Sequence, residues 1–330
     1  MMRRVPCYAL FFRLQLLCAT LLVIWPFAAA AQGTYPTRPI RLIVPFPPGG
    51  STTIMARLIG QKLTESWGKQ VVVDNRGGGN TIIGSQALVR AAPDGYTILN
   101  VTSTHSINPS LLATPYDAIK DFAPVATTIA TESLMVVTPG LPAHNLKELI
   151  ALAKAKPGQL NFASSGSGTS NHLSAELFCI MAGIKMQHIP HKGAGPATTD
   201  LMGGQVQMFM NNALPLIPLV KAGSMRAIAI SGGKRLVSLP DVPTFAEAGL
   251  PGYEVKSWQG ILAPAGTPKP IIDKLAQEIT RILNTPEMTE QLLAMGADPF
   301  PGGPQQFAAL IKADLTRYAK LIKQANIKLE

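Results

Sequence analysis

The sequence predicts an α/β fold made of two lobes, each built on a mainly parallel sheet that helices flank. Three observations lead to this expectation. Patterns of buried strand, turn and amphipathic helix alternate in two successive sets, which is typical of parallel sheets covered by helices. About 300 residues remain after an N-terminal segment typical of export, and chains of that length commonly divide into two domains. The C-terminal part contains helices that have no strands of their own beside them.

Residues 1–31 have the pattern of a secretory signal peptide. A basic start is followed by an apolar stretch from Leu14 to Phe27 and by the alanines Ala28–Ala31, in the order of a cleaved signal sequence. We expect cleavage after Ala30 or Ala31 and a periplasmic mature protein. A membrane anchor is the alternative, but the apolar stretch is short for a bilayer span. Lipid attachment at Cys18 is disfavoured, because leucines precede this cysteine where small residues are usual.

The composition argues against nucleic-acid binding and against disulfide bonds. After the predicted cleavage site there are 26 basic and 19 acidic residues, a net charge of +7. The basic residues are spread out, and the clustered footprint of a nucleic-acid-binding surface is missing. Cys179 is the one cysteine that remains. Its apolar, helical surroundings favour a buried structural thiol, so stability must come from the hydrophobic core.

The first set of elements begins with a buried strand at Arg41–Phe46, where β-branched and other apolar residues form a continuous run. It ends with a strand at Tyr96–Val101. Between them we expect a turn, an amphipathic helix, a short strand and a second helix, at Pro47–Gly50, Ser51–Gly68, Val71–Val73 and Ile83–Ala91.

The second set contains five further strands, and helices separate most of them. Asn145 and Glu148 form a variant of the capping box at the start of one helix. A small polar loop at Gly166–Ser170 precedes a second helix, which runs through Leu173, Leu177 and Met181, and a third helix lies around Asp200–Met202. The strands are expected at Met135–Thr138, Asn161–Ser164, Gln187–Pro190, Val206–Asn211 and Arg226–Ser231.

The last portion is helical. Thr267 and Pro268 form an N-cap followed by proline at the first helical position, and another helix begins near Pro304. We expect both helices to pack back on the first sheet, so that the chain leaves the first lobe near Thr131 and returns near Ser257. The first lobe then comprises residues 32–132 and 251–330, and the second comprises residues 133–250.

The sequence lacks the common enzyme signatures. It has no P-loop, no H-E-x-x-H and no G-x-S-x-G, and Gly77–Ile82 fails the dinucleotide-binding pattern at its last glycine. His188 and His191 lie three residues apart on an extended segment, which places their rings on opposite faces and disfavours a metal site. We expect no cofactor and no metal. A secreted hydrolase or transferase is disfavoured, because no nucleophile–base–orienter set can be assigned.

Two loops have the composition of anion-binding turns. They are Pro47–Thr53 and Ser164–Ser170, and each lies between the end of a strand and the start of a helix. Helix N-termini expose unpaired N–H groups and a partial positive charge, glycine lets the backbone approach a ligand, and hydroxyls add donors. Each loop alone is explained by capping and turn chemistry. Together they indicate a ligand site beyond the carboxyl ends of the strands.

Further polar residues are expected at strand ends near the same site. Each of them taken alone is more often a loop, surface or core residue, and Trp258 is equally compatible with packing at the return crossing. They are Thr104, His105, His191, Lys192, Gly193, Asn211, Asn212 and Trp258.

From Tyr35 to the C-terminus the chain resembles the extracytoplasmic receptors of tripartite tricarboxylate transporters, the Bug-type solute receptors. The resemblance rests on many short motifs in the same order. The markers are Tyr35-Pro36, Pro45–Gly50, Ala56-Arg57, Asp74–Arg76, Ala92–Thr97, Lys120–Phe122, Gly168–Leu173, Lys192-Gly193, Asp200-Leu201, Gly203–Gln205, Leu239–Thr244, Ala246–Gly249 and Ala263–Pro268.

The resemblance implies a type II periplasmic-binding-protein fold, in which hinge crossovers join two lobes that close over a ligand. It implies a carboxylate ligand, of which one carboxylate group is held by the family's two loops, partly through bridging waters. These loops correspond here to Phe46–Ser51, with Pro48 and Gly49, and to Ser165–Ser170, with Gly166 and Thr169. Lys192-Gly193 matches the family's Lys-Gly loop.

This chain departs from the family pattern at three places. Thr53 stands where aspartate is usual, His191 where tyrosine is frequent, and Asn211-Asn212 where an Asp-Asn pair is usual. Because Thr53 and Asn211 replace acidic residues, the local negative charge is lower than is usual in the family. If His191 faces the cleft, it can donate a hydrogen bond to a second carboxylate of the ligand.

The sequence thus predicts a monomeric periplasmic solute-binding protein that captures a small organic carboxylate and delivers it to the membrane permease of a tripartite transporter. A receptor that presents its closed lobes to a signalling partner is the alternative. The sequence does not separate these two functions.

Overall fold

The computed structural model describes residues 35–324, with side chains as far as residue 323. The predicted signal peptide lies outside the described residues. From Arg38 onward the described chain belongs to one compact unit. Among the described residues, no helix combines the length and the apolar character that crossing a bilayer requires.

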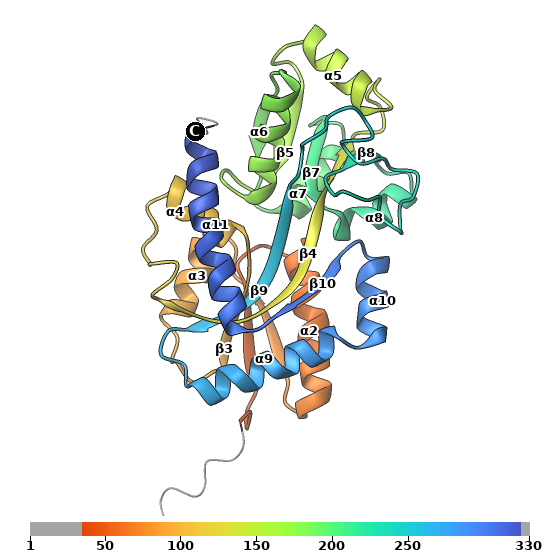
Figure 1. Ribbon diagram of the computed structural model, residues 1–330. Coiled ribbons are helices and arrows are strands. Elements are labelled where there is room, and N and C mark those ends of the chain that lie inside the picture. The colour runs from red at the N-terminus through yellow and green to blue at the C-terminus, as the bar shows by residue number, and fades with distance from the viewer. Residues whose placement is uncertain (1–34, 325–330) are drawn as a thin grey trace, which may run out of the picture. The chain divides into compact units, whose positions relative to one another are not determined.

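The ten strands of the described chain form a curled sheet, with helices on its faces (Figure 1). The strand order is β2-β1-β3-β9-β4-β7-β5-β6, and β8 and β10 also pair with β4. The strands are β1 Ile40–Val44, β2 Val71–Asn75, β3 Thr97–Thr102, β4 Phe122–Val137, β5 Asn161–Ser164, β6 Gln187–Pro190, β7 Met208–Asn212, β8 Arg226–Ile230, β9 Lys256–Pro264 and β10 Asp298–Gly302.

The helices follow the predicted alternation and add three that the sequence patterns did not reveal, namely α4, α8 and α10. The helices are α2 Ser51–Trp67, α3 Ile82–Val89, α4 Thr104–Leu111, α5 Leu146–Ala155, α6 Ser170–Ala182, α7 Ala194–Met202, α8 Ala213–Lys221, α9 Lys269–Leu283, α10 Pro286–Ala294 and α11 Pro304–Gln324.

The sheet is parallel on its two flanks and antiparallel in its centre. β1 pairs in parallel with β2 and β3, and β5 pairs in parallel with β6 and β7. The long strands β4 and β9 run antiparallel between these flanks. The prediction found only the last residues of β4, at Met135–Thr138, because the preceding residues mix threonine and alanine without a continuous apolar run.

Strand β4 belongs to both halves of the sheet. Its first part, to Glu132, pairs with β9, and from Ser133 it pairs with β7. Thr131 on β4 lies opposite Ser257 on β9. Figure 1 shows the two strands running together between the lower and the upper groups of elements. The polypeptide therefore passes between the two parallel flanks on adjacent strands.

The C-terminal helices pack on the first half of the sheet, as predicted. Phe307 and Ile311 of α11 lie in one buried cluster with Trp258 and Leu262 of β9 and with residues of β1 and β3. Gly260 makes this packing possible, because a Cβ atom there would lie 2.4 Å from Phe307 Cζ and 2.9 Å from the Ala126 carbonyl oxygen.

Two local predictions have direct counterparts. Asn145 caps α5 through a hydrogen bond from the Glu148 N–H at 3.0 Å, and Glu148 accepts from the His144 N–H at 2.7 Å. Cys179 is buried, and burial raises the pKa of its thiol to about 12.

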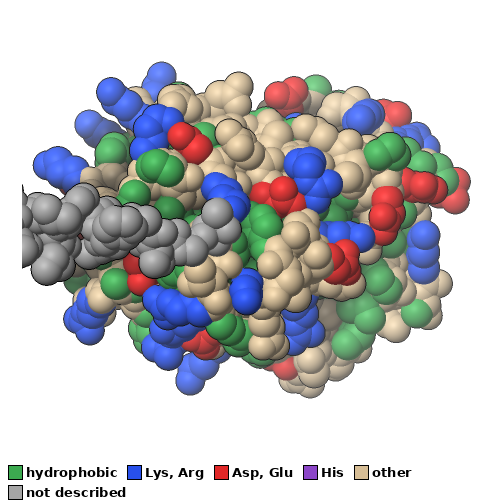
Figure 2. All heavy atoms as spheres, turned by 90° about the horizontal axis from the view of Figure 1, so that it is seen from below, with side chains coloured by type: hydrophobic (Ala, Val, Ile, Leu, Met, Phe, Trp, Pro, Cys, Tyr) green, Lys and Arg blue, Asp and Glu red, His purple; other side chains and the backbone are tan. Residues whose placement is uncertain are grey.

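On the face shown in Figure 2, Lys and Arg side chains are spread out and acidic side chains lie among them.

Candidate functional site

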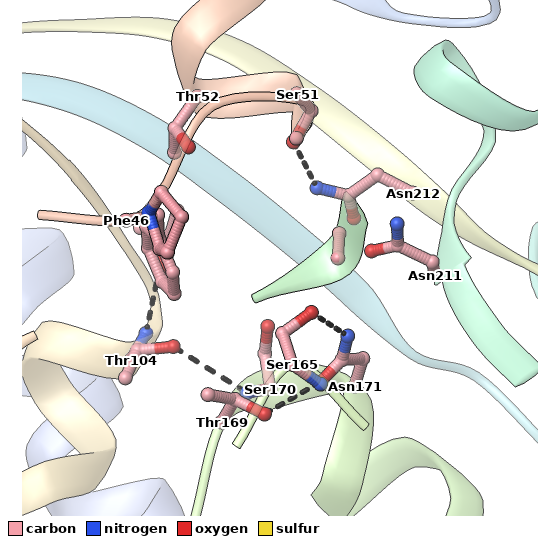
Figure 3. A pocket seen from close by; sticks show the side chains of 14 residues that line it. Phe46, Ser51, Thr52, Thr104, Ser165, Thr169, Ser170, Asn171, Asn211 and Asn212 are labelled. Atoms are coloured by element: carbon pink, nitrogen blue, oxygen red, sulfur yellow. Dashed lines mark hydrogen bonds between the residues drawn. The ribbon is translucent and has the colours of Figure 1, made fainter. Parts of the chain in front are cut away.

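The structure brings the polar turns after four strands together at one small pocket (Figure 3). The turns follow β1, β3, β5 and β7 and lead into α2, α4, α6 and α8. Carboxyl ends of parallel strands are where open sheets bind ligands. The pocket has a volume of about 40 Å³ and is lined by Phe46, Pro47, Gly50, Ser51, Thr52, Thr102, Thr104, Ser165, Thr169, Ser170, Asn171, Ala194, Asn211 and Asn212.

Helix N-termini supply the electrostatics of this pocket. The N-cap residues of α2, α4, α6 and α8 are Gly50, Ser103, Thr169 and Asn212, and none of them makes a side-chain capping hydrogen bond. The N–H groups of these first turns carry a partial positive charge. None of the lining side chains is ionisable. The pocket is therefore suited to an anion that is held by neutral donors.

Ser51 presents a hydroxyl donor. Its Oγ accepts hydrogen bonds from Asn212 Nδ2 and Gln259 Nε2, both at 3.0 Å. A serine oxygen has two acceptor lone pairs and one O–H. Because both lone pairs of Ser51 Oγ are used, its O–H remains available to donate to a ligand. Asn100 holds the carbonyl end of Gln259 at 3.2 Å and also donates to the Thr52 carbonyl oxygen at 3.0 Å. This buried network fixes the orientation of Ser51.

Asn211 is the second unused donor of the pocket. It is 7% exposed, and its Nδ2 has no hydrogen-bond partner within the described chain. Figure 3 shows its amide beside Asn212, with the amide oxygen toward the middle of the pocket and the nitrogen turned away from it. A buried donor without a partner is destabilising. An exchange of its amide oxygen and nitrogen would bring the donor to a ligand oxygen in the pocket.

The second predicted loop is braced by Asn171. Its Nδ2 donates to Ser165 Oγ at 2.7 Å, and its Oδ1 accepts from the Ser165 N–H at 3.3 Å and lies 2.5 Å from Thr169 Oγ1. Across the pocket, the Ser170 N–H donates to Thr104 Oγ1 at 3.4 Å. The loop is thus tied both to its own helix and to α4.

Two stacked histidines, His172 and His188, form hydrogen bonds with the same loop. The Gly168 N–H donates to His172 Nδ1 at 3.0 Å, and the Gly166 N–H donates to Ser164 Oγ at 3.1 Å. His188 Nε2 lies 2.6 Å from Ser164 Oγ, and the two imidazole centroids are 3.9 Å apart. Burial and the neighbouring His172 lower the pKa of His188 to about 3. The stacked ring pair therefore holds the glycine loop in place.

The structure places the predicted site residues in three groups. Phe46, Ser51, Thr104, Ser165, Thr169, Ser170 and Asn211 line the pocket. Gly166, His191, Lys192 and Gly193 line a second, larger cavity. Pro48, Gly49, His105 and Trp258 line neither of the two cavities.

Pro48 and Gly49 pack against the start of α7. A Cβ atom on Gly49, whose φ is +102°, would lie 3.5 Å from Gly195 Cα, and one on Gly195 would lie 3.3 Å from the Pro48 carbonyl oxygen. The two loops approach here through their backbones. A side chain at either glycine would therefore meet the backbone of the facing loop.

His105 and Trp258 were expected near the ligand, but both lie in the core. His105 Nε2 bonds to the Ala118 carbonyl oxygen at 2.9 Å, and burial lowers the pKa of its ring to about 4. His105 follows Thr104 on α4, and a helix turns by about 100° per residue. The side chain of Thr104 therefore faces the pocket while that of His105 faces the core. Trp258 Nε1 donates to Asp314 Oδ2 at 2.6 Å, and its ring meets Phe307 edge-on.

His191 does not offer a free donor, in contrast to the hypothesis from the sequence. Its Nδ1 lies 3.0 Å from the Ile189 carbonyl oxygen and its Nε2 lies 2.8 Å from Asp200 Oδ2. Both ring nitrogens are therefore engaged within the protein. The neighbouring Lys192 is exposed and forms no ion pair with any described residue.

The sequence patterns missed several lining residues. Thr102, Asn171 and Ala194 belong to the pocket, and Asn212 was noted only as a strand end. Asn171 and Ala194 lie in the first turn of a helix. That position is the signal that would have identified them, because first-turn residues flank the exposed N–H groups.

Comparison with known proteins places the chain in a family. The sequence profile of the tripartite tricarboxylate transporter family receptors matches residues 55–327. BugT of Bordetella pertussis is 38% identical over 309 residues, covering 92% of this chain and 94% of BugT. A protein from the tcbD–tcbE intergenic region of a Pseudomonas strain is 38% identical over 296 residues, covering 89% of this chain and 88% of its own.

Solved structures agree with this assignment. Rpa4515 of R. palustris, solved with adipate, has a TM-score of 0.87 at 36% identity and covers 89% of this chain and 99% of its own. The periplasmic binding protein BugD has a TM-score of 0.85 at 33% identity, with coverages of 90% and 100%. MatC of Rhodopseudomonas palustris, solved with malate, has a TM-score of 0.82 at 30% identity, with coverages of 87% and 100%. The chain therefore has the fold of these periplasmic receptors and belongs to the receptor family of the tripartite tricarboxylate transporters.

Proposed function

We propose that this protein is a periplasmic receptor that captures a small organic carboxylate in the pocket of Figure 3 and delivers it to the membrane subunits of a tripartite transporter. The observation that carries the proposal is the convergence of four helix N-termini on a pocket without ionisable side chains. The relatives solved with adipate and malate support a carboxylate as the ligand.

The pocket chemistry favours a carboxylate over a cation or a neutral sugar. Ser51 and Asn211 offer donors, and the first-turn N–H groups add partial positive charge. No acidic side chain lines the pocket, so an ammonium group of a ligand would have no counter-charge there. Carboxylic acids without an amino group are therefore the expected class.

The lobes would correspond to residues 32–132 with 251–330, and to residues 133–250. Strand β4 changes partners between Glu132 and Ser133, which supports this division. The pocket lies between the two groups of elements, because Ser51 contacts Asn212 and Thr104 contacts Ser170 across it. Ligand binding would then favour the closed arrangement of the lobes. Residues 1–31 would direct export, and the mature protein would act as a monomer.

A thermal-shift and calorimetric screen tests the proposal, with protein secreted from the full-length precursor. Mono-, di- and tricarboxylates are compared with their methyl esters, with inorganic phosphate and with neutral sugars. At a concentration a hundred times the Kd, a ligand stabilises the folded state by about 2.7 kcal/mol, a shift of several degrees. We expect stabilisation by carboxylates, none by the esters, and recovery of the ligand chemically unchanged.

Stabilisation by phosphate or by neutral sugars alone would overturn the carboxylate assignment. Recovery of a hydrolysed ligand would overturn the assignment as a binding protein. Each outcome is read from the same samples, by calorimetry and by mass analysis of the released ligand.

A further inference from the structure

Two adjacent strands, β4 and β9, join the two halves of the sheet (Figure 1), and one serine hydroxyl bridges them. β4 changes partners between Glu132 and Ser133, and Lys256 at the start of β9 lies opposite Glu132. Ser231, which follows β8, accepts a hydrogen bond at its Oγ from the Ser133 N–H at 2.8 Å. The same Oγ lies 2.6 Å from the carbonyl oxygen of Val255, the residue before β9. Ser231 is buried, so these contacts are shielded from solvent.

The Ser231 hydroxyl has a third neighbour, because Glu132 Oε2 lies 3.0 Å from Ser231 Oγ. A serine hydroxyl has one proton and two lone pairs. The Val255 carbonyl oxygen can only accept, so the short contact of 2.6 Å places the proton of Ser231 there. The Ser133 N–H uses one lone pair of Ser231 Oγ. The other lone pair is left to face Glu132 Oε2.

A proton on Glu132 accounts for this third contact. Two oxygen atoms 3.0 Å apart form a hydrogen bond only when a proton lies between them. Because Val255 takes the proton of Ser231, the proton of this contact must come from Glu132. A protonated carboxyl group has one O–H donor, and with it every donor and acceptor of Ser231 is matched. An ionised Glu132 would instead set a lone pair of its carboxylate against a lone pair of Ser231.

The surroundings of Glu132 also favour the neutral form. A Cβ atom on Gly232 would lie 2.9 Å from Glu132 Cγ and 3.0 Å from its Cδ, so backbone covers this side chain. Burial raises the pKa of the Glu132 carboxyl. Three charged groups face it: Lys256 on β9 favours the ionised form, whereas Asp298 on β10 and Glu254 before β9 oppose it.

We propose that Glu132 is a proton-dependent link between β4 and β9. With its proton, Glu132 donates to Ser231 Oγ and holds the two crossing strands in one network of hydrogen bonds. Without the proton, the contact with Ser231 is lost and the crossing loosens. The crossing is a hinge only if the lobes move as the proposed function requires, whereas the proton on Glu132 follows from the hydrogen bonds. A receptor with this link has its stiffest hinge in acidic surroundings.

Urea unfolding and amide hydrogen exchange of the mature protein without ligand, from about pH 4.5 to about pH 8.5, test this link across the range in which a raised carboxyl pKa falls. The proteins are the wild type, Glu132→Gln and Glu290→Gln. Glutamine keeps the shape of Glu132 and supplies an N–H donor to Ser231 at every pH. Glu290→Gln is the matched control, because it removes one exposed acid on α10.

A raised pKa stabilises the folded protein below the ordinary pKa of glutamate, and this contribution is lost as the pH rises through the pKa of the folded protein. Glu132→Gln should therefore match the wild type at the lowest pH and gain stability relative to it as the pH rises. The gain should reach at most about a tenfold change in the folding equilibrium constant per pH unit. Glu290→Gln should follow the wild type.

Hydrogen exchange gives a local readout at the Ser133 N–H, which donates to Ser231 Oγ. After correction for the intrinsic exchange rate, its protection should fall with rising pH in the wild type and stay constant in Glu132→Gln. The wild-type measurement alone carries the test if the variant does not fold.

A constant difference in stability between Glu132→Gln and the wild type, or a loss in the variant that grows with pH, would overturn the link. Constant protection of Ser133 in the wild type would overturn it as well. Neither measurement uses a ligand. If both results hold while no carboxylic acid binds to the wild type, the proposed function fails and the link stands, so the two failures are distinguishable.

Discussion

Replacing Asn211 by aspartate would change the charge of the polar pocket with almost no change in shape. Asn211 is buried, its Nδ2 lacks a partner, and it lines a cavity of about 40 Å³. A carboxylate held in this pocket lies next to Asn211, which lines it. The aspartate would therefore face the ligand's negative charge at close range.

The magnitude follows from Coulomb's law. Two unit charges about 4 Å apart interact by about 4 kcal/mol at an effective dielectric constant of about 20, which sets an upper limit of roughly a thousandfold on the loss of affinity, in a family where an Asp-Asn pair is usual at this place. Asn211→Leu removes only the donor, and a net hydrogen bond contributes about 1 kcal/mol, roughly a fivefold loss. The difference between the two variants isolates the charge.

Titration calorimetry with the acid that binds most tightly in the screen measures both losses. Asn145→Asp is the matched control, because it introduces the same charge at an exposed N-cap where aspartate is as favourable as asparagine. Burial raises the pKa of a carboxyl group, so Asn211→Asp should regain affinity as the pH falls and its side chain is protonated. The wild type should not show this gain.

Equal losses in Asn211→Asp and Asn211→Leu would refute the reasoning, since they would mean that the ligand's negative charge lies elsewhere. A gain of affinity for amino acids in Asn211→Asp would agree with it, because the new acid would pair with their ammonium group.

Three further predictions concern the fold. Gly260→Ala should lower the free energy of unfolding by about 2 kcal/mol, because its Cβ would collide with Phe307; an unchanged urea midpoint would contradict the packing of α11 on β9. Burial lowers the pKa of His105 to about 4, so the unfolded chain binds more protons between that pH and about 6.5. Stability should then fall as the pH decreases through this window, by up to about 1.4 kcal/mol per pH unit, and His105→Gln should flatten the decrease in denaturation curves. Cys179 is buried and burial raises its pKa to about 12, so a thiol reagent should label it only as fast as the protein unfolds; rapid labelling of the native protein would show that the helix around it opens.

Much of the fold follows from local patterns. The apolar residues of β1, the capping box of α5 and the glycine-bearing turns before α2 and α6 depend on neighbouring residues, whose periods and turn chemistry are visible in the chain. The antiparallel strands β9 and β10 and the first part of β4 were not visible. Their residues form strands because they pair with segments far away in the sequence, as Thr131 does with Ser257.

The site, like the fold, could be predicted only in part. Two loops whose composition suits an anion could be predicted from the hydroxyls and glycines that follow strands. Sequence alone also gave the family, through markers in a fixed order. It did not distinguish Thr104 from His105, because adjacent helical residues differ only in the direction they face, and that direction has meaning only against a packed neighbour.

The sequence by itself determined that this protein is an α/β receptor with helix N-termini available for an anion. Only the tertiary structure decided which donors remain unused, how small the polar pocket is and which cation is unpaired. The physical reason is that hydrogen-bond partners come from remote segments: Asn212 reaches Ser51 across 161 residues, and Asp200 engages His191 while Lys192 stays unpaired. The spacing of residues along the chain does not show which side chains will take the available hydrogen-bond and ion-pair partners.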